Sequence, residues 1–219
     1  VSLRNPDDGR NHALETLACV GNPAKIISGP MKGATGYVTG THGGVEHTMV
    51  WLPGDVLEGM EGNETFLIRA RGQGLELTDH PDVFVMNLDP ALLEKMPLQE
   101  TENGLSFPVA AVIPAYMMGA GLGEQTLMEG DYDIMTQDRQ EVKRLGLDKL
   151  RFGDIVAIQD HYAAYGPHYK QGAVTIGVIV HSDSFTSGHG PGVTGLATAQ
   201  KGLGWHLDPD ANLKTWLCR

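Results

Sequence analysis

Short apolar runs separated by turn-forming segments dominate the first part of the chain. Gly, Pro, Asn and Glu residues follow each run, so every run is short enough to be a strand that ends in a turn. The runs are LACV (17–20), AKIIS (24–28), TGYVTG (35–40), HTMVWL (47–52) and TFLIRARG (65–72). Five such runs at this spacing predict a small antiparallel barrel.

A helical pattern follows these runs at residues 89–96. Asp89 can cap the helix, Pro90 suits its first position, and Leu92, Leu93 and Met96 lie on one face. The polar, turn-prone segment PLQETENG comes next and predicts a domain boundary near residue 100.

The second part of the chain alternates strand and helix patterns. Two prolines in 107–114 argue against one continuous central strand there, and 137–146 has a helical apolar face. We expect strands at 151–160 and 173–180, joined by a loop over 161–172. The second strand lacks period-2 alternation, which predicts that both of its faces are covered.

These patterns together predict a mainly β protein with a few short helices. We expect an N-terminal arm (1–18), a small β-barrel domain that ends in a helix (19–100), and a larger, β-barrel-like domain that carries the site (101–219). The Gly-rich KGATGYVTG segment resembles the turn of SH3-like barrels. Short, Gly-rich strands leave sheet edges that need cover, so a homo-oligomer is expected.

Charge and cysteine content narrow the class of partner. The net charge of −11 and the lack of a basic cluster argue against nucleic acid as a partner. No apolar run is long enough for a membrane span, so no membrane partner is expected. Two cysteines at unrelated positions form no disulfide framework, which favours a reducing cytoplasm.

Two groups of candidate metal ligands lie in turn contexts. His42 and His47 flank a Gly-Gly turn, and Asp131 and Asp133 stand two positions apart, where an extended chain points both to one side. Imidazoles and paired acids of this kind could bind a divalent metal ion, or the acids could split their pKa values and act as acid and base. Solvent-exposed turns are the alternative interpretation.

Two further groups are candidates for catalysis and ligand binding. Asp160 and His161 come at the end of a buried strand, and His161 is the candidate general base. A Gly-rich loop after the 173–180 strand can present free backbone amides to a polar ligand, although tight loop geometry alone also explains its glycines. The candidate ligand-binding residues of this loop are His181, Asp183, Gly188, His189, Gly190 and Gly192.

Several of these segments resemble a bacterial domain-of-unknown-function family, DUF4438. They are GNPAKIISGPMKGATGYVTGTHGGVEH, RGQGLEL, HPDVFVMNLDPALLEKM and the long block from 151 to 193. The order EGDYDI, GDIVAIQDHYAAYG, GAVTIGVIV is also similar to the acetamidase/formamidase pattern. That likeness implies that Asp133, Asp160 and His161 take the place of catalytic acids and histidine. Asp131 stands where that family has Asn, and no residue separates Asp160 from His161.

Two functional hypotheses follow. The first is a hydrolase of a small amide or related carbonyl compound, with catalytic His161, Asp160 and Asp133 and water activated by acid/base chemistry or by a divalent metal ion. The second is a non-catalytic protein that binds a small metabolite or takes part in assembly. Both take a small molecule as substrate or ligand.

Overall fold

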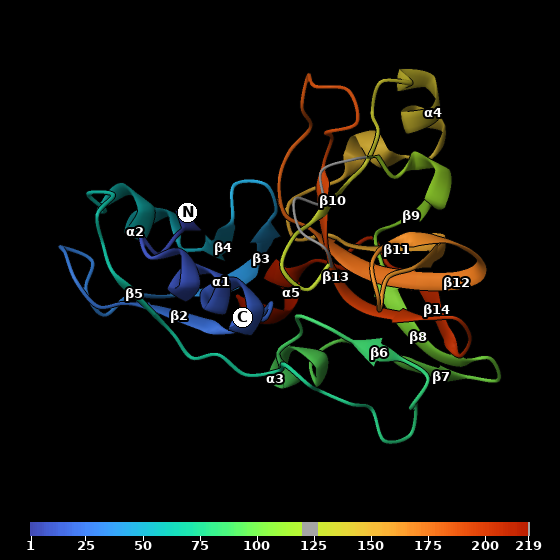
Figure 1. Ribbon diagram of the computed structural model, residues 1–219, viewed down its shortest axis with the longest axis horizontal. Coiled ribbons are helices and arrows are strands. Elements are labelled where there is room, and N and C mark those ends of the chain that lie inside the picture. The colour runs from blue at the N-terminus through green and yellow to red at the C-terminus, as the bar shows by residue number, and fades with distance from the viewer. Residues whose placement is uncertain (120–126, 219) are drawn as a thin grey trace.

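The computed structural model describes residues 1–119 and 127–218 and is mainly β, as the sequence predicts (Figure 1). Its helices are short, and no described helix is long and apolar enough to cross a membrane. The helices of the described chain are α1 (Asp8–Leu17), α2 (Gly54–Glu58), α3 (Pro90–Leu93), α4 (Arg139–Arg144) and α5 (Leu213–Leu217), with 3-10 turns at Ala115–Met117 and Leu147–Lys149.

The first lobe is an antiparallel sheet with the strand order β1-β4-β3-β2-β5. Ile26, Val38 and Val50 are buried on its inner face together with Leu52. The run at 17–20 forms no strand, and only Val20 makes an isolated bridge. The strands are β1 (Ser2–Leu3), β2 (Pro23–Ile26), β3 (Thr35–His42), β4 (His47–Trp51) and β5 (Phe66–Ile68).

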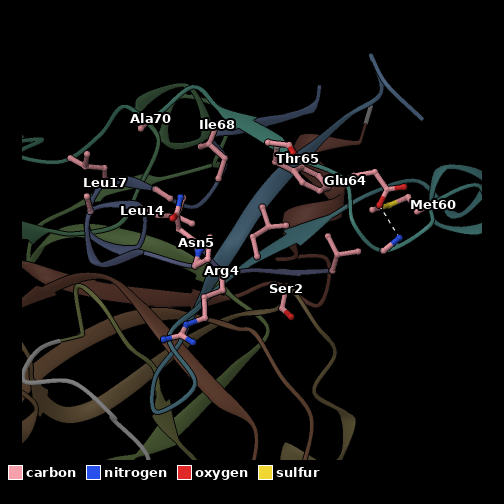
Figure 2. Close-up of a pocket in the computed structure, with 17 residues that line it drawn as sticks. Ser2, Arg4, Asn5, Leu14, Leu17, Met60, Glu64, Thr65, Ile68 and Ala70 are labelled. Carbon is pink, nitrogen blue, oxygen red and sulfur yellow. Dashed lines mark hydrogen bonds between the residues drawn. The ribbon is translucent and has the colours of Figure 1, made fainter. Parts of the chain in front are cut away.

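This sheet is open rather than closed into a barrel. In the described chain no pairing joins the edge strands β1 and β5, and a cleft of about 770 Å³ lies beside them and α1 (Figure 2). Leu14 and Leu17 of α1 line this cleft with Ile68 of β5. Part of the predicted N-terminal arm is helical, since residues 8–17 form α1. The side chain of Asp7 caps this helix by accepting a hydrogen bond from the amide of Arg10.

The second lobe contains a sheet with the strand order β10-β13-β12-β11-β9, in which β6 also pairs with β13, and a smaller sheet β14-β8-β7. The β9–β11 and β8–β14 pairs are parallel, and the other pairs are antiparallel. Its strands are β6 (Phe84–Val85), β7 (Gln99–Thr101), β8 (Gly104–Val109), β9 (Ala111–Pro114), β10 (Tyr132–Asp133), β11 (Ile155–Tyr162), β12 (His168–Ile179), β13 (Gly192–Ala199) and β14 (Leu203–Leu207).

Several local predictions are confirmed in this lobe. Every residue from Ala173 to Ile179 is buried, so both faces of β12 are covered. The segment 104–114 is not one continuous strand, as its two prolines predict, because it is interrupted at Ala110 between β8 and β9. The predicted loop at 161–172 is shorter than expected, because Tyr162 pairs with His168 and extends the β11–β12 hairpin.

The tip of the β3–β4 hairpin joins the first lobe to the second. The hydroxyl of Thr194 accepts a hydrogen bond from the amide of Thr41 and donates one to its carbonyl, both at 3.1 Å. The hydroxyl of Thr41 donates to the carbonyl of Gly130 at 3.0 Å, and Thr41 and Thr194 are both buried. A Cβ on Gly40 would lie 2.3 Å from Val180 Cγ1, so the backbone at Gly40 packs directly against side chains of the second lobe.

Replacing Thr194 with Val should remove this junction's hydroxyl while keeping its volume. The amide and carbonyl of Thr41 would then be buried without partners, which costs about 1–3 kcal/mol of the free energy of unfolding. Urea denaturation measures the loss. Thr39→Val, on β3 with a partly exposed side chain, is the control and should stay within about 0.5 kcal/mol of wild type. Equal effects of the two changes would contradict the junction's role.

A candidate site of aspartates and histidines between the lobes

Strand β10 places two acids on one side of the second lobe. Asp131 directly precedes the strand and Asp133 ends it, so their side chains point to one side and that of Tyr132 to the other. Asp133 pairs with Gly192 of β13. Asp131 is 0% exposed and Asp133 is 3% exposed, so two carboxylates are buried close together.

His181 and His189, from the loop between β12 and β13, meet these acids. Nε2 of His181 lies 2.7 Å from Oδ2 of Asp131 and 3.1 Å from Oδ1 of Asp133. Its Nδ1 donates a hydrogen bond to the carbonyl of Ser182 at 2.9 Å. Nδ1 of His189 lies 3.1 Å from the other oxygen of Asp133. One imidazole therefore contacts both acids, and a second contacts Asp133 alone.

The first lobe completes the cluster with His42, the last residue of β3. Its ring stacks on that of His181 with 4.4 Å between centroids. Nδ1 of His42 donates to the carbonyl of Gly43 at 2.7 Å, and the amide of Gly43 donates to Oδ1 of Asp131 at 2.7 Å. Gly43 was not among the predicted site residues, and only the Gly-Gly sequence after His42 hinted that the backbone there is accessible.

A single imidazole nitrogen faces both acids. Nε2 of His181 carries at most one proton and lies against an oxygen of each carboxylate. Oδ2 of Asp131 is buried without a hydrogen bond, although Nε2 is only 2.7 Å away. Among the salt bridges of the described residues, only histidines pair with Asp131 and Asp133. Oδ2 of Asp131 therefore has the imidazole of His181 beside it but makes no hydrogen bond, which is unusual for a buried polar atom.

The electrostatics of His181 follow from this arrangement. Burial disfavours its charged form, but the close contacts with the carboxylates of Asp131 and Asp133 and the charge of Asp131 outweigh burial and raise the pKa of His181 to about 10. Donor atoms of His42, Asp131 and His181 all lie within 4.8 Å of one another, close enough to hold a metal ion. A metal ion on Nε2 would take the place of its proton.

His47 and Asp183, two further predicted site residues, lie next to this cluster but are not part of it. His47 faces His42 across the hairpin in the β3–β4 register but is not part of the metal-ligand group. Asp183 accepts hydrogen bonds from Thr136 and, at 2.7 Å, from Arg139, and so ties the 181–191 loop to the start of α4. Its partial burial disfavours the charged form, but these two donors outweigh burial and lower the pKa of Asp183.

The glycines of the loop are placed by close packing. A Cβ on Gly192 would lie 1.9 Å from Oδ2 of Asp131 and 2.3 Å from Nε2 of His181. A Cβ on Gly190 would lie 1.9 Å from the carbonyl oxygen of Ile134, and Gly188 has φ of 80°. Tight geometry therefore accounts for these glycines, and their binding of a ligand stays a prediction.

His161 and Asp160 are not joined to the cluster by any bond between described residues. His161 is buried beside Tyr132, with its Nδ1 2.9 Å from the hydroxyl of Thr175. Asp160 has φ of 59° in a β-bulge, and its carboxylate accepts a hydrogen bond from the amide of Gly172 at 2.7 Å. Burial first, and then the charge of His168, lowers the pKa of His161 to about 4.

The fold and the site define a two-lobed, mainly β protein with an acid–imidazole cluster at the lobe junction. Two protein-family sequence models match the chain. The one described as Domain of unknown function (DUF4438), N-terminal, matches residues 1–94, and the one for the C-terminal domain of the same family matches residues 95–217. The chain therefore belongs to the DUF4438 family. His42 falls in the N-terminal model and the other members of the cluster in the C-terminal one, so both family domains contribute to the site.

One solved structure is similar along nearly the whole chain. The crystal structure of TM1086 matches with a TM-score of 0.92 and 44% sequence identity, covering 99% of this chain and 76% of that chain. No curated protein matches the sequence. The resemblance to acetamidase/formamidase is not confirmed by these matches.

Adding one methyl group at Gly192 should displace the pair formed by Asp131 and His181. Gly192→Ala places a Cβ where both side chains lie and should destabilise the fold by about 1–3 kcal/mol, as overpacking does. Chemical denaturation measures the change. Gly204→Ala in β14, where a Cβ meets nothing within 4 Å, is the control and should be close to neutral. A Gly192→Ala variant as stable as the control would contradict the close packing.

His161 should make stability fall with decreasing pH. Its folded-state pKa of about 4 lies below the ordinary 6.5, so its contribution is complete above pH 6.5 and is lost as the pH falls toward 4, where only the unfolded chain takes up the proton. The loss amounts to about 3 kcal/mol. Denaturation curves of wild type and His161→Gln at pH 7 and pH 4 test this. A stability difference between them that is independent of pH would contradict it.

Proposed function

We propose that this protein is a hydrolase of a small amide or related carbonyl compound and that Asp131, Asp133 and His181 activate the attacking water. The observation that carries the proposal is that one imidazole nitrogen, Nε2 of His181, faces two buried carboxylates, and that Oδ2 of Asp131 is buried without a hydrogen bond. Such a site favours the uptake of a proton or a cation. Perturbed titratable groups of this kind are typical of catalytic sites.

In the proposed reaction, Asp133 accepts a proton from water while the water oxygen bonds to the carbonyl carbon. The oxyanion formed at this step is stabilised by positive charge, either the imidazolium of His181 or a divalent ion. The C–N bond then breaks, and the proton held by Asp133 passes to the leaving nitrogen. The products are a carboxylic acid and an amine. His189, hydrogen-bonded to Asp133, orients that carboxylate.

The proposal assigns water activation to this cluster rather than to His161. A histidine with a pKa of about 4 is a weak base at neutral pH, and His161 is enclosed beside Tyr132 and Thr175. The carboxylate of Asp160 is committed to the amide of Gly172. His161 and Asp160 are therefore assigned a structural role. Of the three residues predicted to be catalytic, the proposal keeps Asp133.

A non-catalytic binding or assembly protein is the second candidate. The contact between His42 of one lobe and His181 of the other favours it, because a molecule bound beside these stacked rings would touch both lobes. The expected partner is a small molecule in either case. Homo-oligomerisation and a cytoplasmic location stay predictions.

A panel of small amides, lactones and ureides tests the hydrolase. Wild type should turn over at least one of them, and Asp133→Asn should lower kcat/KM by about 10²–10⁴-fold, because loss of the general base removes that much of the rate. Asp148→Asn, an exposed acid of the same lobe, is the control and should match wild type.

The results separate the two candidates. Turnover that survives Asp133→Asn would refute the assignment of the site. An absence of turnover across the panel, combined with an increase in Tm on addition of one of the same compounds, would refute the hydrolase and favour the binding protein.

A further inference from the structure

We infer that His42, Asp131 and His181 form a binding site for one divalent transition-metal ion, such as Zn²⁺, shared between the two lobes. Their donor atoms lie within 4.8 Å of one another, and Asp131 is completely buried. The inference concerns the same cluster as the proposed function and would supply its cation. It does not require hydrolysis, because metal binding can be measured by itself.

The tautomers of the two histidines suit metal ligation. Nδ1 of His42 faces the carbonyl of Gly43, and Nδ1 of His181 faces the carbonyl of Ser182. A carbonyl only accepts hydrogen bonds, so Nδ1 is a donor in both rings, and Nε2 of His181, which lies against both acids, is the nitrogen that a metal would bind in that ring. Metal-bound histidines almost always donate their other N–H to a carbonyl or carboxylate in this way.

Charge balance is the second, independent argument. Asp131 and Asp133 bring two negative charges into a buried space, and no described lysine or arginine pairs with either of them. A divalent ion bound here would neutralise both carboxylates. It would also supply the partner that Oδ2 of Asp131 lacks.

The donor set indicates the class of metal. Mg²⁺ and Ca²⁺ prefer sites made of oxygen atoms, whereas imidazole nitrogens suit Zn²⁺ and other transition metals. Two histidines and one carboxylate are three protein ligands, and a catalytic zinc site with three protein ligands keeps a position for water. Asp133, 3.1 Å from Nε2 of His181, is a neighbour of this ligand group and not one of its three members.

The site depends on the docking of the two lobes. His42 reaches Asp131 only because the hairpin tip is fixed by Thr41, Thr194 and the amide of Gly43. Bound metal would therefore link residues 42–47 to the second lobe. His47, on the same hairpin and of the same residue type but outside the ligand group, offers a matched control.

Zinc binding by untagged, chelator-treated protein tests the inference through isothermal titration calorimetry. Wild type should bind one Zn²⁺ per chain, with Mg²⁺ unable to compete. His42→Ala and Asp131→Asn should each weaken Zn²⁺ binding by more than about 100-fold, while His47→Ala changes it by less than about threefold. Hydrogen exchange of residues 42–47 should slow on addition of Zn²⁺ in wild type and in His47→Ala only.

Anomalous diffraction from Zn²⁺-soaked wild-type crystals keeps the test valid if a variant fails to fold. A peak between His42, Asp131 and His181 is expected. A peak elsewhere, no saturable binding, or equal losses in His42→Ala and His47→Ala would overturn the inference. Zinc binding at this place without hydrolysis of any panel compound would support the metal site and refute the hydrolase. Hydrolysis that is unaffected by chelation would support the hydrolase and count against the metal site.

Discussion

The buried carboxylate of Asp131 is the contact on which the arrangement of the site depends. One of its oxygens accepts the amide of Gly43 from the first lobe, and the other lies against His181 of the second. A charge removed from water needs compensation from the protein or from a bound ion. The groups that contact this carboxylate come from both lobes. The chemistry of the cluster therefore depends on the docking of the lobes.

In the second lobe, a glycine makes room for the buried carboxylate and its histidine partner. Gly192 pairs with Asp133, and its missing side chain leaves the space that Asp131 and His181 occupy. The loop that carries His181 and His189 is also held by Asp183, through Thr136 and Arg139. The imidazoles are thus presented by an anchored loop, which limits their freedom before anything binds.

The alternation of side chains along β10 separates two environments. On one side, Asp131 and Asp133 meet the histidines of the lobe junction. On the other, Tyr132 packs against His161, which burial keeps neutral and Thr175 orients. Both sides contain a histidine beside polar groups, but only the first combines two buried carboxylates with a histidine whose pKa they raise. Strand β10 therefore separates the candidate site, on the side of Asp131 and Asp133, from the packing of Tyr132 against His161 on the other side.

Local features of this protein were readable from its sequence. The apolar runs at 24–28, 35–40 and 47–52 became strands, and Asp89 caps α3 as its side chain and the following Pro90 predict. These features depend on neighbouring residues alone. The pairing of Asp131 and Asp133 on one side also follows from the period of a strand.

What the tertiary structure decided is which of the candidate groups meet. Gly43 and Asp131 are 88 positions apart, and no local pattern relates them. The same holds for the separation of His161 from the acids, which depends on which face of β11 packs beside Tyr132, and for the exclusion of His47 from the metal-ligand group. Strand order and lobe docking arise from packing over the whole chain, so the sequence could name the candidate residues but not the site they form.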